Sequence, residues 1–122
     1  MAIMVKALIC GSRHYDNYDK VKETVKSLVD EHGKIIIIEG GAKGADTLAK
    51  NAAIELGIEY REYKADWKRY GRAAGPKRNQ LMLDTENPDL VIAFHEDLES
   101  GKGTKDMLKR AEKAGVKTII YE

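Results

Sequence analysis

The sequence predicts an α/β fold in which five parallel strands form an open sheet with helices on both faces. Ile35–Ile38 and Leu90–Phe94 are continuous apolar runs, which are typical of strands buried on both faces of a parallel sheet. Strand patterns alternate with helical patterns along the chain, and the connections are short, as in consecutive βαβ units. With 122 residues, the chain is long enough for one domain and too short for two.

The first half of the chain is expected to hold three strands and two helices. The predicted strands are 2–10, 34–39 and 58–63. The first helix is capped by Asp16 or Asn17 and ends at Gly33, and the second spans 45–56. The strand at 58–63 alternates apolar and charged residues, which predicts a less buried position toward one edge of the sheet.

The second half begins with a segment of no clear period, 64–74, which we interpret as a long loop. Gly75 and Pro76 open a third helix, because proline suits the first helical position, and this helix runs to about Thr85. The remaining predicted elements are a strand at 89–94, a loop at 95–103, a helix at 104–114 and a strand at 116–121.

Four loops are expected to meet at one edge of this sheet. They begin at Gly11, Gly40, Lys64 and His95, each after a predicted strand. Because α/β proteins bind ligands outside the carboxyl ends of parallel strands, this edge is the predicted binding site.

The first of these loops, Gly11–Arg13, offers several donors to a phosphate. They are the backbone from Gly11, the hydroxyl of Ser12 and the guanidinium of Arg13. The alternative interpretation is a capping turn with a solvated arginine.

The turn at 40–44 joins a buried strand to the start of a helix and is a candidate phosphate cradle. Its glycines permit a sharp turn, and the following helix presents free N–H groups and the positive end of its dipole. The turn has neither the Gly-Lys-Ser/Thr ending of a Walker A loop nor the GxGxxG pattern. Tight packing, a solvated lysine and a capping aspartate therefore stay open as alternatives. The candidate ligand-binding residues here are Gly40, Gly41, Ala42, Lys43, Gly44 and Asp46.

A basic stretch with interleaved aromatic residues spans 61–78. Such a composition suits the stacking of a base and the binding of its phosphates. The alternative for Trp67 is the hydrophobic anchor of a solvated loop. Arg78 and Asn79 are favoured over the loop lysines, because they fall in the first turn of the third helix at the same edge. The candidate binding residues are Trp67, Gly75, Arg78 and Asn79.

A second glycine turn, at 100–104, precedes the fourth helix. Its backbone N–H groups and the threonine hydroxyl are candidate donors to another phosphate. The candidate binding residues are Ser100, Gly101, Gly103 and Thr104.

Charge and composition narrow the classes of function. The 21 Lys and Arg residues nearly balance the 20 Asp and Glu residues, so the net charge of +1 gives no overall electrostatic case for nucleic acid or a membrane. A single cysteine, Cys10, leaves no internal disulfide, and no Cys/His cluster has metal-ligand spacing. No apolar run has the length of a membrane span, and the first strand does not read as a signal peptide. We expect a cytoplasmic protein without a cofactor or a metal.

No catalytic residue is identified from the sequence. The GxSxG motif of a nucleophile elbow is absent. His14 and His95 fall at the predicted ligand edge, where each is either a base or a solvated side chain. His32, at a helix end, is expected to interact with the helix dipole.

The order of these motifs strongly resembles the small YspA-like, YpsA-related members of the SLOG superfamily. The motifs are Gly-Ser-Arg at 11–13, Glu-Gly-Gly-Ala-Lys-Gly-Ala-Asp at 39–46, Ala-Asp-Trp at 65–67, Gly-Arg-Ala-Ala-Gly-Pro-Lys-Arg-Asn at 71–79 and Ser-Gly-Lys-Gly-Thr at 100–104. This superfamily has a Rossmann-like fold. It includes the LOG phosphoribohydrolases, the DNA-processing protein DprA and sensor domains for nucleotide-derived signals such as cyclic ADP-ribose isomers. The resemblance implies a nucleotide or ADP-ribose-type ligand and a homodimer.

One departure from the LOG pattern bears on activity. LOG enzymes carry an arginine on the third helix, which Arg78 matches, and a PGGxGTxxE motif whose glutamate is catalytic. Met107 stands at the glutamate position here, and methionine can neither stabilise an oxocarbenium-like centre nor transfer a proton. Asp106 is one residue away, which on a helix is a rotation of about 100°.

The sequence therefore favours a binding module that senses or sequesters a nucleotide-derived ligand. One alternative is a nucleotide-processing hydrolase that cleaves an N-glycosidic or phosphate bond with Asp46, Asp66 or Glu39 as the acid. A weaker alternative is a module that binds single-stranded nucleic acid through the basic stretch.

Overall fold

The structure is a computed structural model that describes residues 4–122. The strands are β1 (Met4–Gly11), β2 (Lys34–Glu39), β3 (Glu59–Glu62), β4 (Leu90–Phe94) and β5 (Lys117–Tyr121). The α-helices are α1 (Tyr18–His32), α2 (Ala45–Leu56), α3 (Trp67–Tyr70), α4 (Ala74–Glu86) and α5 (Lys102–Lys113). Two short 3-10 helices are η1 (Gly71–Ala73) and η2 (Leu98–Ser100). Residues 2 and 3 of the predicted first strand lie outside the described residues.

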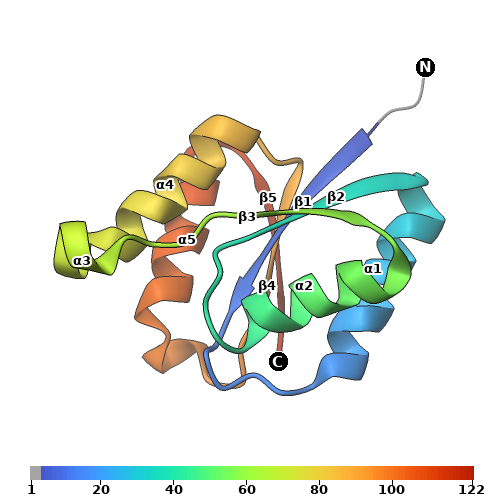
Figure 1. The fold of residues 1–122 in the computed structure, drawn as a ribbon, viewed down its shortest axis with the longest axis horizontal. Coiled ribbons are helices and arrows are strands. Elements are labelled where there is room, and N and C mark those ends of the chain that lie inside the picture. The colour runs from blue at the N-terminus through green and yellow to red at the C-terminus, as the bar shows by residue number, and fades with distance from the viewer. Residues whose placement is uncertain (1–3) are drawn as a thin grey trace.

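The five strands form one parallel sheet in the order β3-β2-β1-β4-β5 (Figure 1). β1 lies at the centre, where Leu8 pairs with Ile38 of β2 and Val91 of β4. The chain runs outward from β1 in both directions, so the loops after β1 and β4 leave the sheet side by side. The predicted fold class is confirmed.

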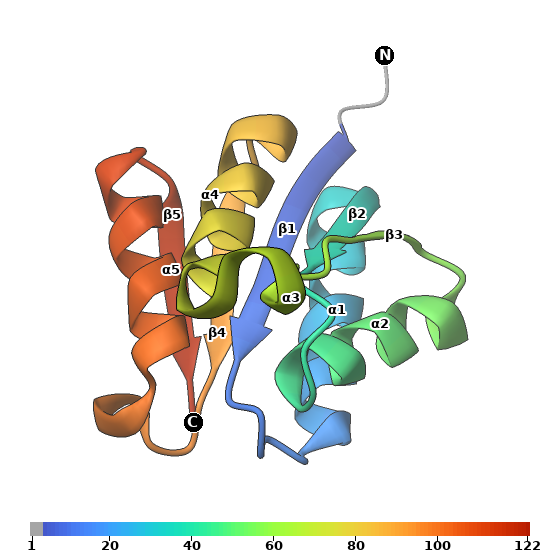
Figure 2. The ribbon, with the colours of Figure 1, turned by 60° about the vertical axis from the view of Figure 1, so that its left-hand side comes forward.

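Helices cover both faces of the sheet. Side chains of α1 and α2 pack with one face of the sheet, where Ile35 and Ile37 point, and side chains of α4 and α5 pack with the other, where Ile36 and Ile38 point. Figure 2 shows α1 and α2 on one side of the strands and α4 and α5 on the other, with α3 in front between the two pairs. The alternation along β2 explains why four consecutive isoleucines are all buried.

The edge strands are more exposed than the centre. All five residues of β4 are buried, as its apolar run predicts. Every residue of β3 is exposed or half-buried, which confirms the predicted edge position of the alternating segment.

Two predicted loops contain short helices. Within 64–74, α3 and η1 precede α4, and Asp66 caps α3 by accepting a hydrogen bond from the backbone N–H of Arg69 at 3.2 Å. A helix of four residues is too short to produce a period, so the interpretation of 64–74 as one long loop was wrong. Similarly, η2 lies within 95–103, and α5 begins at Lys102 because the N–H of Lys105 bonds to the carbonyl of Gly101 at 2.8 Å.

None of the helices among residues 4–122 is long and apolar enough to cross a membrane.

Candidate functional site

A cleft of about 1050 Å³ opens at the carboxyl ends of β1 and β4. Its walls come from the loops after β1, β2 and β4, from α3, and from α4 and α5. Of the predicted binding residues, all but Gly40 and Gly44 line it. The structure therefore brings the predicted residues together in one cavity.

Gly44 lets the loop after β1 and the turn after β2 touch. Its φ of +78° is a backbone conformation that favours glycine, and a Cβ built there would overlap the carbonyl oxygen of Ser12. The backbone N–H of Ala45 also bonds to that oxygen at 3.0 Å. Gly44 thus acts beneath the cleft, as a packing residue, and not in its wall.

The turn at 40–44 uses its backbone donors internally. The N–H groups of Gly40 and Ala42 bond to Oδ2 of Asp46 at 3.2 and 3.1 Å, and the N–H of Gly41 bonds to Oε1 of Glu39 at 2.5 Å. These are donors that a phosphate cradle would have to offer. The prediction that this turn presents its backbone to a ligand is therefore not supported by its hydrogen bonds.

The carboxyl groups of Asp46 and Glu39, which accept the N–H groups of this turn, have raised pKa values. Burial raises the pKa of Asp46 to about 6, against the lowering effects of its backbone donors and of Arg78. Glu39 is fully buried, and burial together with Glu62 raises its pKa to about 8. Since β2 and β3 pair Glu39 directly with Glu62, one proton held by Glu39 relieves the repulsion between two neighbouring carboxylates.

Lysines compensate the charge of the outer carboxylate of this pair. Lys50 of α2 and Lys64 after β3 lie 3.5 and 3.7 Å from the carboxylate of Glu62. The pKa of Glu62 is lowered, most by the protonated Glu39 beside it and then by these two lysines. Oε2 of Glu39 is buried without a hydrogen-bond partner among the described residues. The pair thus has a charged outer member and a protonated inner member at neutral pH.

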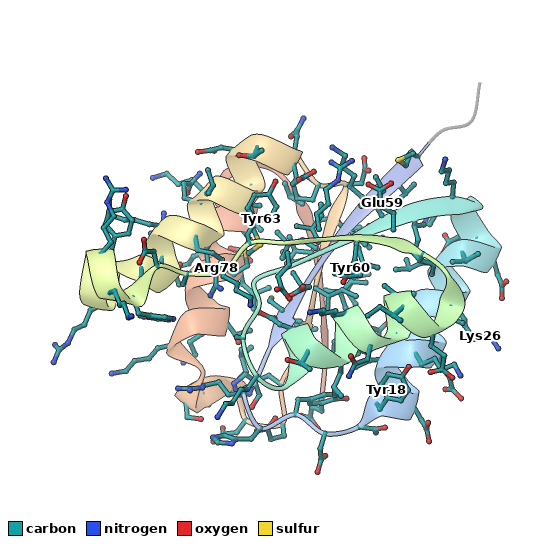
Figure 3. The ribbon with its side chains drawn as sticks, viewed as in Figure 1. Tyr18, Lys26, Glu59, Tyr60, Tyr63 and Arg78 are labelled. Carbon is teal, nitrogen blue, oxygen red and sulfur yellow. The ribbon has the colours of Figure 1, made fainter. Side chains whose placement is uncertain are left out.

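Arg78 fastens the turn at 40–44 to α4. Its Nη1 donates to the carbonyl of Gly40 and its Nε donates to Oδ1 of Asn79 at 3.0 Å. Figure 3 shows Arg78 on the side of α4 that faces the sheet. Two of the five N–H donors of this guanidinium therefore bond to the protein itself.

The start of α5 differs from the turn at 40–44, although neither α2 nor α5 has a side-chain cap. Gly101 precedes the helix without a side-chain cap, and the backbone N–H groups of Lys102, Gly103 and Thr104 have no hydrogen-bond partner among the described residues. All of these residues line the cleft. Together with the positive end of the helix dipole, these groups favour an anion at this position.

His95 adds a donor beside these N–H groups. Its side chain is 93% buried, and its Nδ1 accepts a hydrogen bond from the backbone N–H of Asp97 at 2.9 Å. The ring proton of the imidazole is then on Nε2. A Cβ at Gly101 would lie 2.5 Å from Nε2, so only glycine lets the ring reach the start of α5. The solvated alternative for His95 is wrong.

The carboxylates in the cleft wall are all engaged. Glu96 accepts a hydrogen bond from the hydroxyl of Ser12 at 2.7 Å, and Asp46 accepts from the turn. Asp106 accepts from Asn79 at 3.0 Å and from Arg110 at 2.9 Å. The cleft extends around α5 far enough to include Asp106, although this residue is rotated by about 100° from the position of Met107.

Two further residues of the cleft, Met107 and Cys10, do not supply an acid or a nucleophile. Met107 is buried in the apolar cluster between the sheet and α5. The pKa of the Cys10 thiol is raised by burial and by the charge of Asp46, which keeps it protonated. No group of three Asp, Glu, His or Cys side chains within residues 4–122 is arranged to hold a metal ion.

Cationic side chains outnumber carboxylates in the wall of the cleft. The carboxylates are those of Asp46, Glu96 and Asp106, and the lysine and arginine side chains are those of Arg13, Lys43, Arg72, Arg78 and Lys102. The whole chain has a net charge of only +1, so the positive charge is concentrated at the cleft. The local field therefore favours an anionic ligand.

The sequence analysis did not identify all of the residues that line the cleft. Cys10, Met82 and Glu96 line the cleft but were not among the predicted binding residues. Glu96 had a usable signal, because it follows the buried run of β4 by two residues. No sequence signal marked Cys10 or Met82 as binding residues, because an apolar residue within a strand or helix pattern is assigned to the hydrophobic core.

Trp67 is 60% exposed and lines the cleft, so it is not a buried anchor. The interpretation of its ring as a hydrophobic anchor of the loop was wrong.

The parallel sheet order and the cleft at its carboxyl edge define a Rossmann-like α/β protein. The YspA, cpYpsA-related SLOG family (YAcAr) matches residues 5–70, more than half of the chain, and this protein belongs to that family. No curated protein matches the chain.

Two solved structures of DNA processing protein A (DprA) have a similar fold. The protein from Helicobacter pylori has a TM-score of 0.70 at 17% identity, over 95% of this chain and 64% of that chain. The protein from Streptococcus pneumoniae has a TM-score of 0.57 at 18% identity, over 97% of this chain and 59% of that chain. This chain thus spans about three fifths of the length of the two DprA chains. At these identities the likeness shows the fold alone.

Proposed function

We propose that the cleft binds a nucleotide-derived small molecule, of the ADP-ribose or cyclic-nucleotide type, as a sensor or a sequestering protein. The observation that carries this proposal is the start of α5. There three backbone N–H groups, which have no partner within residues 4–122, and the side chain of His95 belong to residues that line one cationic cleft. Membership of the SLOG family supports a nucleotide-derived ligand. The volume of about 1050 Å³ is ample for one or two nucleotide units.

Binding without hydrolysis is favoured by the state of the acids. Each carboxylate in the wall already accepts hydrogen bonds from the protein, and the position of the LOG glutamate holds the buried Met107. A general acid or base needs a free proton-transfer path to the substrate. Chromatography of the ligand after prolonged incubation tests this point, because release of a free base or a sugar phosphate would identify a hydrolase.

The direct test of the proposal is the variant His95→Asn. Asparagine keeps an acceptor for the N–H of Asp97 through Oδ1 but removes the donor at Nε2. We expect the affinity for AMP, measured by isothermal titration calorimetry, to fall roughly tenfold or more, as for a lost hydrogen bond to a charged group. His32→Asn, at the far end of α1, is the matched control and should bind AMP like the parent protein. Equal affinities of parent and His95→Asn for AMP would place the phosphate elsewhere.

A second candidate function is the binding of single-stranded DNA. The exposed side of α3 and the start of α4 carry basic side chains around Trp67 and Tyr70, and DprA of Helicobacter pylori, which has a similar fold, binds single-stranded DNA. Oligonucleotide binding through a phosphate-tracking surface weakens steeply with salt, whereas binding of a mononucleotide in a cleft depends on salt much less. Titration with oligothymidylate at two salt concentrations separates the two functions.

A further inference from the structure

Trp67 is the single tryptophan of the chain, and its large apolar ring is mostly exposed to solvent. Burying a tryptophan side chain is strongly favourable, so an exposed ring in the wall of a cleft needs an explanation. The surroundings of the ring show that it is held in place.

Local hydrogen bonds fix the short helix that carries the ring. The carboxylate of Asp66 caps α3, and the backbone carbonyl of Asp66 accepts the N–H of Tyr70 at 3.0 Å. One edge of the indole rests on α4, because a Cβ at Gly75 would lie 3.3 Å from Cη2 of Trp67. The ring is thus supported on one edge, and much of the rest is open.

The neighbouring aromatic ring is already covered. Cζ of Arg69 and Nζ of Lys77 lie 5.2 and 4.9 Å from the centroid of the Tyr70 ring, within the range of cation–π contacts. Among the described residues, no lysine or arginine has such a contact with the ring of Trp67. The π-face of Trp67 therefore stays available to a ligand.

The ring and the start of α5 belong to the same cleft but to different walls. Trp67 comes from α3, before the first turn of α4, and the free N–H groups come from α5. Figure 2 shows α3 in front of the sheet, separate from the start of α5. A ligand that fills the cleft can place a planar group on the ring while its phosphate lies at α5.

We propose that Trp67 is the stacking platform for the nucleobase of the bound ligand, so that the cleft selects phosphates that carry a base over sugar phosphates that lack one. This inference rests on the proposed function, since the phosphate end of the ligand is the one assigned to α5. It adds the residue that recognises the base of this ligand and hence the basis on which the cleft discriminates.

The fluorescence of Trp67 provides the test, because no other tryptophan contributes to the signal. AMP should quench this fluorescence in a saturable way, whereas ribose 5-phosphate should bind more weakly and leave the emission unchanged. Trp67→Ala should weaken AMP binding roughly tenfold, as expected for the loss of one stacked base, and should change the affinity for ribose 5-phosphate less than twofold. Trp67→Phe should recover most of the affinity for AMP, and Tyr70→Ala, whose ring is covered by cations, should bind AMP like the parent.

The outcomes separate this inference from the proposed function. If AMP and ribose 5-phosphate bind equally well and the emission does not change, the stacking inference is overturned and the proposed function stands. If neither AMP, ADP-ribose nor ribose 5-phosphate binds, the proposed function fails with it. If oligothymidylate quenches Trp67 and AMP does not, the ring belongs to a single-stranded DNA surface and the inference is overturned.

Discussion

The two glycine turns at the edge of the sheet look alike in sequence but differ in what their backbones can do. At 40–44, the N–H groups of Gly40, Gly41 and Ala42 bond to carboxyl groups of the protein itself. At the start of α5, the N–H groups have no partner among the described residues, and the ring of His95 lies beside them. The first turn is closed by the protein's own carboxyl groups, and the second is open to an anion from outside.

This difference shows how one motif serves both stability and binding. A carboxylate that accepts backbone N–H groups replaces the phosphate that a glycine turn otherwise attracts. The first turn then fixes the loops of the cleft, through Gly44 and Arg78, and the second takes the ligand. Substitutions in the turn at 40–44 should therefore reduce the stability of the fold, whereas substitutions at the start of α5 should reduce the affinity for the ligand.

The largest effect is expected from Gly44→Ala in the closed turn. The new Cβ would overlap the carbonyl of Ser12, and the φ of +78° is unfavourable for alanine. We expect the free energy of unfolding, measured by urea denaturation, to fall by about 3–5 kcal/mol. A loss below 1 kcal/mol would mean that the two loops are not packed as described.

The next largest effect is expected from Glu39→Gln and depends on pH. The folded pKa of Glu39, about 8, is above its usual value of 4.5, so the folded state keeps a proton that the unfolded chain releases between these pH values. The free energy of unfolding of the parent protein therefore falls as the pH rises from 4.5 to 8. The lowered pKa of Glu62 acts in the opposite direction and offsets part of this fall. The glutamine variant lacks this loss and should be more stable than the parent at pH 8 by about 2–4 kcal/mol.

Urea denaturation at pH 4.5 and pH 8 measures the effect of Glu39→Gln. Glu23→Gln, an exposed site on α1, is the control and should show no such dependence. If Glu39→Gln and the parent differ in free energy of unfolding by the same amount at both pH values, Glu39 does not hold a proton in the folded state.

A smaller effect is expected from Arg78→Ala. The variant loses the donors to Gly40 and Asn79, at a cost of about 1–3 kcal/mol in the free energy of unfolding. It also loses the positive charge that lowers the pKa of Asp46, so this pKa should rise above about 6 in a carboxyl NMR titration. Arg72→Ala, an exposed arginine of the same cleft, should leave both quantities unchanged. If Arg78→Ala weakens AMP binding without changing stability, Arg78 contacts the phosphate directly.

The smallest change in stability is expected from Gly103→Ala in the open turn. No atom lies within 4 Å of the new Cβ, and alanine favours a helix over glycine by about 0.5–1 kcal/mol. The variant should be slightly more stable than the parent and should bind AMP several-fold more weakly, because the methyl group enters the space at the free N–H groups. Unchanged affinity for AMP in calorimetry would contradict an anion at the start of α5.

Several elements followed from the sequence because their signals are local. The bounds of β2 and α2 agree with the predicted 34–39 and 45–56, since an unbroken apolar run, a helical stripe and flanking glycines mark their ends. The helix α3 did not follow, because a single turn of helix has no period. Its cap, Asp66, was visible in the sequence as part of the Ala-Asp-Trp motif.

Part of the candidate site could likewise be predicted from the sequence and part could not. The order of strands and helices was enough to place the loops at one edge, and nearly all predicted binding residues line one cleft there. Whether a backbone N–H group in that cleft is free or occupied was not visible. That property depends on the side chains of Glu39 and Asp46, which the sequence presented as the end of a strand and the cap of a helix.

The sequence by itself determined the α/β class, the parallel order of elements and the edge where the loops gather, because apolar periodicity and glycine positions act over short distances. Only the tertiary structure decided which turn is closed and which is open. The pairing of β2 with β3 sets Glu39 against Glu62, and the approach of Gly101 to His95 brings a buried donor to α5. The first contact joins two strands that are separated by a whole helix, and the second folds the loop after β4 back on itself, so no periodic pattern of residues encodes either.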